Sequence, residues 1–306
     1  AEPIYMGNGA RTPMGGLLGD LADVTAVDLG AAAVKATLDK TGVKPGAIDE
    51  VFMGCVLPAG LKQCPARQAM IGAGIPSSTG AVTVNKACGS GMQATIYAID
   101  SIAAGTNQMV ISGGLESMSN APQLMMTGRK GIRLGHGQTF DHMFIDGLED
   151  AYTGGAMGGF AQATADAHGL TREAMDQYAI ASLERAKAAT ENGVLQAEIT
   201  PVTIKTRRGE HTVEHDEQPL KGRPDKIPSL RPAFTKDGTI TAANSSSISD
   251  GASALLVASA SAVEAHNLQP MAKIVAHARF SRPPEEFTLA PVGAIEKLLE
   301  RTGWNA

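Results

Sequence analysis

The sequence predicts an α/β fold, because short apolar runs alternate with helical patterns through residues 1–118. The clearest example is a strand pattern at residues 82–85, then a helical pattern that Gly105 ends, then a strand pattern at residues 108–112. A strand, a helix and a strand in this order form a β-α-β unit. Such a unit predicts a parallel sheet.

Other segments agree with this class. Residues 4–8 have the pattern of a strand, and residues 25–40 have that of a helix, with Thr25 as its N-cap and Gly42 just beyond its end. From Thr239 onward the β/α pattern resumes, and we expect strands at residues 252–258 and 272–276.

Between these regions the sequence changes character, and a weak repeat marks its end. Residues 120–241 combine methionines, glycines and basic residues with two helical patterns and a polar stretch, which predicts an inserted lobe. KATLDKTGV at residues 35–43 is echoed by KLLERTGW at residues 297–304, as if a second β/α half began there. We therefore expect a first core half at 1–119 and 246–269, an inserted loop domain at 120–245, and the start of a second core half at 270–306. We expect about two-thirds of that second half to lie outside these residues.

The composition limits the kinds of partner that we expect the protein to bind. The chain of 306 residues is 43% hydrophobic and 19% charged, which is typical of a globular protein of more than one domain. Its net charge of −5 gives no general attraction for nucleic acid or anionic membranes, and no apolar run approaches the roughly 18 residues of a membrane span. The three cysteines lack C-x-x-C spacing, and the seven histidines lack metal-ligand spacing, so we expect no disulfide framework and no metal. A cytoplasmic location fits these features best.

Cys88 is the residue with the strongest chemical signal. It stands in NKACGSGM, between a predicted strand and a predicted helix, where backbone N–H groups and the helix dipole stabilise a thiolate. The flanking glycines leave room for a substrate carbonyl, and the same N–H groups can stabilise an oxyanion. The alternative is that Cys88 is an inert core cysteine. We interpret Cys55 in this way, and we place Cys64 in a loop, where it lacks a glycine-framed turn.

Ligand signals are weaker. Basic residues gather in the inserted lobe, for instance at residues 129–133 and 221–223, where a phosphate-bearing ligand would bind unless these are ordinary solvated surface. The sequence has no G-x-x-x-x-G-K-[ST] loop and no G-x-G-x-x-G after a strand. The usual sequence signatures of nucleotide hydrolysis and of hydride transfer are therefore absent from this sequence.

Several further motifs occur along the chain. They are ARTP at 10–13, PARQA at 65–69, NKACGSGMQA around Cys88, SGGLESMS at 112–119, LRPAF at 230–234, and GTITAANSSSISDGASALL from Gly238. Together they resemble the thiolase family nearly from end to end, in the form found in acetyl-CoA acetyltransferases. The resemblance implies a thiolase-like α-β-α-β-α layered core of two similar halves, the second incomplete here, with an inserted loop domain that binds CoA.

The resemblance also implies a reaction and its residues. Cys88 would take an acetyl group from one acyl-CoA, and the carbanion of a second would attack the acetyl-cysteine. It implies no permanently bound cofactor, acyl-CoA as substrate, and a homo-oligomer, dimer or tetramer, with residues 125–133 as a contact loop. Phe287 would stand beside the acyl pocket. The CoA contacts would be Leu148, Met157, Phe234, Ala242, Ala243, Ser246 and Ile248, with a looser basic contact at Lys221 and Arg223.

One departure from the family pattern keeps alternatives open. The family's other catalytic groups lie in an Asn-Glu-Ala segment, a Gly-His-Pro segment and a late Cys-x-Gly, and none occurs in residues 1–306. We expect either that this stretch belongs to a longer active enzyme or that it is inactive alone. The competing interpretations are a non-catalytic thiolase-like CoA-binding scaffold and a condensing enzyme of the ketoacyl synthase type.

Overall fold

The computed structural model describes residues 2–207 and 209–306, which form two compact units. Unit 1 comprises the chain up to Gly147 together with Asn192–Gln218 and Ile248–Ile274. Unit 2 comprises Leu148–Glu191, Pro219–Ser247 and Val275–Ala306.

Unit 1 is built on a mixed sheet. Within the described residues this sheet has seven strands in the order β11-β1-β10-β5-β3-β4, with the short β2 paired to β10. The strands are β1 (Ile4–Arg11), β2 (Gly15–Gly16), β3 (Glu50–Gly54), β4 (Gly80–Val84), β5 (Met109–Ser117), β10 (Ser249–Ser259) and β11 (Ala272–Ile274).

The predicted parallel arrangement is confirmed for part of this sheet only. Strand β3 pairs in parallel with both β4 and β5, but β10 runs antiparallel to β5 and to β1. The chain reaches β10 after a long excursion from the end of β5, so no short crossover helix imposes a parallel direction there.

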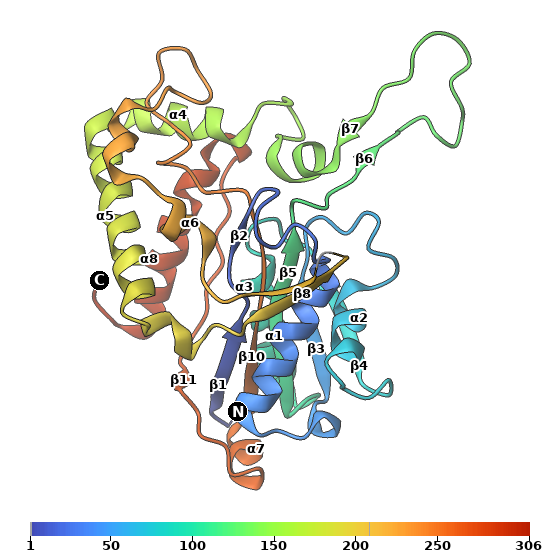
Figure 1. Cartoon of the computed structure of the whole chain (residues 1–306). Helices are drawn as coiled ribbons and strands as arrows, with labels where there is room; N and C mark the ends of the chain where they lie inside the picture. The colour runs from blue at the N-terminus through green and yellow to red at the C-terminus, as the bar shows by residue number, and fades with distance from the viewer. Residues whose placement is uncertain (1, 208) are drawn as a thin grey trace. The chain divides into compact units, whose positions relative to one another are not determined.

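Helices cover both faces of the sheet (Figure 1). Helices α1 (Ala26–Thr41) and α2 (Pro65–Gly72) pack together on one face, and α3 (Ser90–Ala103) packs on the other. Two separate apolar clusters result. The larger includes Leu29 and Met70, and the smaller includes Ala94 and Ile102. Burial of these two layers is the main stabilising contribution to unit 1.

The ends of α1 are as the sequence predicts. The hydroxyl of Thr25 accepts the N–H of Asp28 at 3.1 Å, and Gly42 takes the left-handed conformation with φ +70°. The repeat noted in the sequence has the same geometry at α8 (Ala290–Thr302) of unit 2, where Gly303 also has φ +70°. In both copies the threonine before the glycine donates to the carbonyl four residues back, at 2.8 Å.

The remaining elements of unit 1 are short. They are η1 (Pro45–Ala47), the hairpin of β6 (Gln123–Leu124) and β7 (Phe140–Asp141), η3 (Val194–Ala197), the hairpin of β8 (Val202–Thr206) and β9 (Gly209–Val213), and α7 (Ala260–Ala265). Arg11 binds Asp216 through two hydrogen bonds of 2.7 and 3.0 Å, and this ion pair ties the segment after β9 to β1.

Unit 2 is helical. It contains α4 (Met157–Ala167), α5 (Arg172–Glu191), α8, η4 (Pro224–Ser229) and η5 (Pro284–Leu289), while η2 (Phe144–Leu148) and α6 (Glu217–Lys221) lie at its borders with unit 1. The two helical patterns expected between residues 120 and 241 are present as α4 and α5. Helix α4 packs against η5, where the Thr164 and Thr288 hydroxyls are 2.8 Å apart. No helix in the described residues combines the length and apolar character needed to cross a membrane.

Candidate functional site

Cys88 lies in a tight turn between β4 and α3, as the sequence predicts. The turn is closed by the N–H of Gly89, which donates to the carbonyl of Lys86, and by that of Ser90, which donates to Ala87, both at 3.1 Å. Ala87 takes the left-handed conformation with φ +46°, which is uncommon for a residue with a side chain. Cys88 is exposed and lies directly before Gly89, the N-cap of α3, where the helix dipole favours an anion.

Short polar contacts hold this strained turn in place. The Ser90 hydroxyl donates to the carbonyl of Ala87 at 2.6 Å and accepts the N–H of Lys86 at 2.8 Å. The side-chain oxygen of Asn85 accepts the N–H of Ala87 at 3.0 Å. These bonds offset the cost of the left-handed residue, so the backbone around Cys88 has one defined conformation.

Glycines set the distance between this turn and the sheet. A Cβ atom added at Gly54, the last residue of β3, would lie 2.6 Å from the amide nitrogen of Gly91 in α3. A Cβ atom at Gly114 of β5 would lie 3.3 Å from the carbonyl oxygen of Gly54. The start of α3 therefore rests on bare backbone, and no side chain fits between it and β3.

A different environment surrounds Cys55, which follows β3 directly. This cysteine is 1% exposed, and its thiol lies 3.5 Å from the Glu116 carboxylate. Glu116 also accepts the N–H groups of Val56 and Leu57 at 2.8 and 2.9 Å. Burial, together with the nearby Glu116, raises the pKa of the Cys55 thiol to about 12, and burial raises the pKa of the Glu116 carboxyl. Cys55 is thus a protonated core thiol, in agreement with its interpretation from the sequence.

The residues expected to contact CoA fall mostly in unit 2. Phe287 is in unit 2 as well, whereas Cys88 and Ile248 belong to unit 1. Those in unit 2 are Leu148, Met157, Lys221, Arg223, Phe234, Ala242, Ala243 and Ser246.

Contacts within unit 2 bring several of these residues together. The ring of Phe234 packs against Gly158, the residue after Met157, so closely that a side chain at Gly158 would overlap it. The backbone N–H of Ala233 donates to Ile240 at 2.8 Å, which joins the segment of Phe234 to the turn that carries Ala242 and Ala243.

Arg223, which is expected to contact a phosphate of CoA, already forms an ion pair. Arg223 binds the carboxylate of Asp225 through two hydrogen bonds of 3.1 and 3.0 Å, and both side chains are exposed. This pairing raises the pKa of Arg223 and lowers that of Asp225. A phosphate at Arg223 would have to compete with Asp225 for the guanidinium group.

No metal site emerges from the described residues. Among residues 2–207 and 209–306, no group of three His, Cys, Asp or Glu side chains is placed to hold a metal ion.

Comparison with known proteins identifies the family. The model of the thiolase N-terminal domain matches residues 4–261. The chain belongs to the thiolase family. A cytosolic acetyl-CoA acetyltransferase of Gibberella zeae is 44% identical over 306 residues, which cover 99% of this chain and 77% of that protein. An acetyl-CoA acetyltransferase of Pseudomonas aeruginosa is 42% identical over 297 residues, covering 96% of this chain and 76% of that protein.

A solved thiolase has the same fold. The crystal structure of Acat5 thiolase from Ascaris suum in complex with coenzyme A matches with a TM-score of 0.93 and 37% identity, over 99% of this chain and 78% of that one. The predicted family and the thiolase-like α/β fold are therefore confirmed. The assignments of Cys88, of the CoA contacts and of the loop domain at 120–245 remain predictions for this thiolase.

Some residues that shape the site carry little signal in the sequence. Gly54 ends an apolar strand and precedes a cysteine, and nothing in that pattern indicates that it supports the turn of Cys88. Glu116 lies inside SGGLESMS, a motif noticed only as a mark of the family. A carboxylate near the end of a buried strand is the signal that could have singled it out.

Proposed function

We propose that this thiolase is an acetyl-CoA C-acetyltransferase, which reversibly condenses two acyl-CoA molecules to a 3-ketoacyl-CoA such as acetoacetyl-CoA. The observation that carries the proposal is the exposed Cys88 at the start of α3, in a chain 44% identical to an acetyl-CoA acetyltransferase. The solved thiolase in complex with coenzyme A supports CoA thioesters as the substrates.

The reaction divides into two transfers at Cys88. Its thiolate attacks the carbonyl of acetyl-CoA, a carbon–sulfur bond to Cys88 forms, and CoA leaves as a thiolate that takes up a proton. A second acetyl-CoA then gives up an α-proton to a base, and its carbanion attacks the acetyl-cysteine. Cys88 leaves as a thiolate, and acetoacetyl-CoA is released.

The turn of Cys88 supplies two elements of this chemistry. The dipole of α3 favours negative charge near its start, which stabilises both the thiolate and the tetrahedral intermediate. Gly89 and Gly91 leave space for the incoming thioester. In the family the proton transfers belong to groups in segments that residues 1–306 do not contain, so activity is to be tested on the complete polypeptide that carries these residues.

The decisive experiment compares the parent with Cys88→Ala. We expect acetoacetyl-CoA thiolysis in the parent, no measurable turnover in Cys88→Ala, and nearly unchanged CoA affinity in the variant. The matched control is Cys64→Ala, which removes a thiol elsewhere in unit 1 and should retain activity. CoA binding without turnover in the parent would instead favour the non-catalytic CoA-binding scaffold.

We further propose a cytoplasmic homo-oligomer, dimer or tetramer. The loop between β6 and β7 exposes Met126, Ile132 and Leu134, the last with 95% of its surface accessible, as expected of a contact loop. Light scattering of the complete protein at micromolar concentration should give a multiple of the chain mass. A monomer mass would contradict this assembly.

A further inference from the structure

The turn at residues 239–246 carries three of the expected CoA contacts but has no regular secondary structure. Ala242 and Ser246 are exposed, whereas Ile240 and Thr241 are buried, at 6% and 0% exposed. No ladder of backbone hydrogen bonds fixes this segment, so its shape depends on the side chains that bind its backbone.

Gln162 of α4 holds the first half of the turn. Its side-chain oxygen accepts the N–H groups of Thr239 and Ile240 at 2.8 and 3.1 Å, and its amide nitrogen donates to the Thr239 hydroxyl at 3.0 Å. Gln162 is 5% exposed. A buried amide with several good hydrogen bonds fixes the backbone that it binds.

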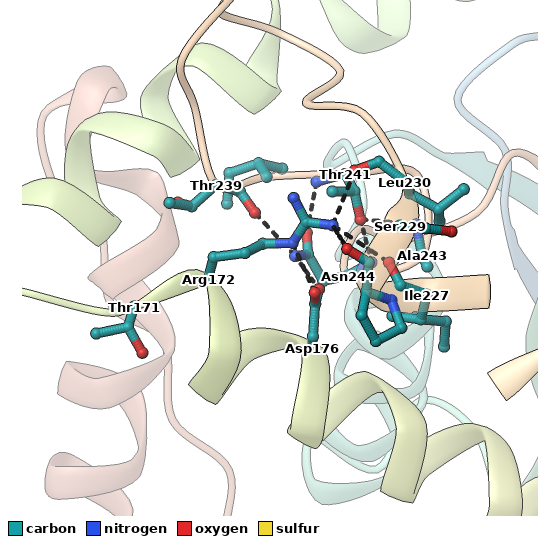
Figure 2. Close-up of polar contacts among 12 residues, drawn as sticks. Thr171, Arg172, Asp176, Ile227, Ser229, Leu230, Thr239, Thr241, Ala243 and Asn244 are labelled. Atoms are coloured by element: carbon teal, nitrogen blue, oxygen red, sulfur yellow. Dashed lines mark hydrogen bonds and ion pairs between the residues drawn. The ribbon is translucent and has the colours of Figure 1, made fainter. Parts of the chain in front are cut away.

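Asn244 and Asp176 hold the second half (Figure 2). The Asn244 oxygen accepts the N–H of Thr241 at 2.7 Å, and its nitrogen donates to the carbonyl of Thr239 at 3.0 Å and to Asp176 of α5 at 3.2 Å. Asn244 therefore closes its own turn and attaches it to a helix. Asp176, which receives this bond, is 4% exposed.

Arg172 connects this attachment to a second segment. Its Nε donates to the other oxygen of Asp176 at 2.6 Å, one helical turn away on α5. The far end of the guanidinium donates to the carbonyls of Ile227, Pro228 and Leu230 at 3.2, 3.3 and 2.9 Å, and Figure 2 shows it pointing into that group. Leu230 begins LRPAF, which ends at Phe234.

One ion pair thus holds two of the segments that carry expected CoA contacts. We infer that Arg172 and Asp176 are positioning residues of the CoA site, which act through Asn244 and through the carbonyls before Phe234; the inference rests on the proposed function. A partly buried ion pair such as this one is a weak source of stability, because apolar side chains of similar size often stabilise as well. It does select one conformation of the chain that it binds, and a preformed turn binds its ligand without the cost of ordering.

The first test follows the turn itself and needs no ligand. Asp176→Asn keeps the size of the side chain but removes the charge that binds Arg172. We expect at least tenfold faster hydrogen exchange in peptides covering residues 239–246, with unchanged exchange in α3. The matched control, Glu184→Gln, removes a carboxylate from the exposed face of the same helix and should leave exchange unchanged.

The second test measures the affinity for CoA. Asp176→Asn should raise the Kd for CoA, and the KM for acetyl-CoA, about tenfold, as expected when a hydrogen bond to a charged group is lost. The kcat and the alkylation rate of Cys88 should stay within twofold of the parent. A double-mutant cycle of Asp176→Ala and Asn244→Ala should be non-additive, because both act on one turn. Arg172→Lys keeps the positive charge but loses the forked guanidinium group. It is used in place of an unstable alanine variant, and it should raise the Kd for CoA by less than Asp176→Asn does.

The outcomes separate the two proposals. Unchanged exchange at residues 239–246 in Asp176→Asn would overturn the positioning role even if the parent is an active thiolase. Faster exchange with unchanged CoA affinity would overturn it too, since the turn would then not serve the ligand. A parent without turnover would end the proposed function, while the exchange and Kd measurements would still decide the role of the pair.

Discussion

Two turns carry the expected chemistry, and each packs against the rest of its unit in a different way. The turn of Cys88 packs on β3 through the backbones of Gly54 and Gly91, so its distance from the sheet depends on the lack of side chains at these glycines. The turn at residues 239–246 is held by polar side chains of α4 and α5, so its position is set by what is present. The Cys88 turn therefore has no room for an added side-chain atom, whereas the turn at residues 239–246 depends on its side-chain hydrogen bonds.

The difference suits the two roles. A nucleophile must be placed relative to the reacting carbonyl with an accuracy of a fraction of an ångström, and backbone packed on backbone allows little movement. A binding turn must fit a long flexible ligand, and hydrogen bonds fix its course while leaving its outer side chains exposed.

The largest expected effect comes from filling the space beneath the Cys88 turn. In Gly54→Ala the new Cβ would meet the Gly91 amide nitrogen at 2.6 Å, so α3 must shift. We expect kcat to fall about 100-fold, since a displacement of about 1 Å can cost that much, and stability to fall by about 1–3 kcal/mol. Thiolysis assays and denaturant unfolding measure the two effects.

The control for this prediction is Gly46→Ala in η1. The nearest atom to its new Cβ is 4.0 Å away, on Pro76, so both activity and stability should stay at the parent level. Parent-like turnover in Gly54→Ala would show that the turn does not depend on close backbone packing.

A smaller effect separates Cys88 from the other two thiols. Brief treatment with iodoacetamide at pH 8 should modify Cys88 at least tenfold faster than Cys64 and faster still than Cys55. Cys88 is exposed at a helix start, whereas Cys55 is buried with a pKa of about 12. At pH 8 the Cys55 thiol is almost entirely protonated, and the thiolate is the reactive form. Peptide mapping gives the rates, and equal labelling in folded protein would remove Cys88 as the nucleophile.

The smallest expected effect concerns the basic contact. Replacing Lys221 and Arg223 together with alanine should raise the KM for acetyl-CoA about fivefold or less, because exposed charge contacts contribute up to about 1 kcal/mol each and Arg223 already binds Asp225. The kcat should not change, since these contacts are the same in the ground and transition states.

The matched control for this pair removes two positive charges from α5, as Arg185→Ala with Lys187→Ala, and should leave KM unchanged. Steady-state kinetics at low salt is the most sensitive condition, because screening is weakest there. A double variant with the parent KM at low salt would place the phosphates elsewhere.

The sequence by itself determined the features that depend on neighbours along the chain. Thr25 as N-cap, the glycines that end α1 and α8, and the strand-turn-helix around Cys88 each follow from a few consecutive residues. The family motifs are likewise local, and so the thiolase assignment and the α/β class could be predicted from the order of residues alone.

Tertiary structure alone decided which residues support these features. Gly54 meets Gly91 from another strand, and Gln162 and Asp176 reach a turn that lies 77 and 68 residues further along the chain. The same holds for the antiparallel entry of β10 into a sheet whose other core strands are parallel. A glycine, a glutamine or an aspartate leaves no periodic signal, because its role depends on the partner that folding brings to it and on the space that remains between them.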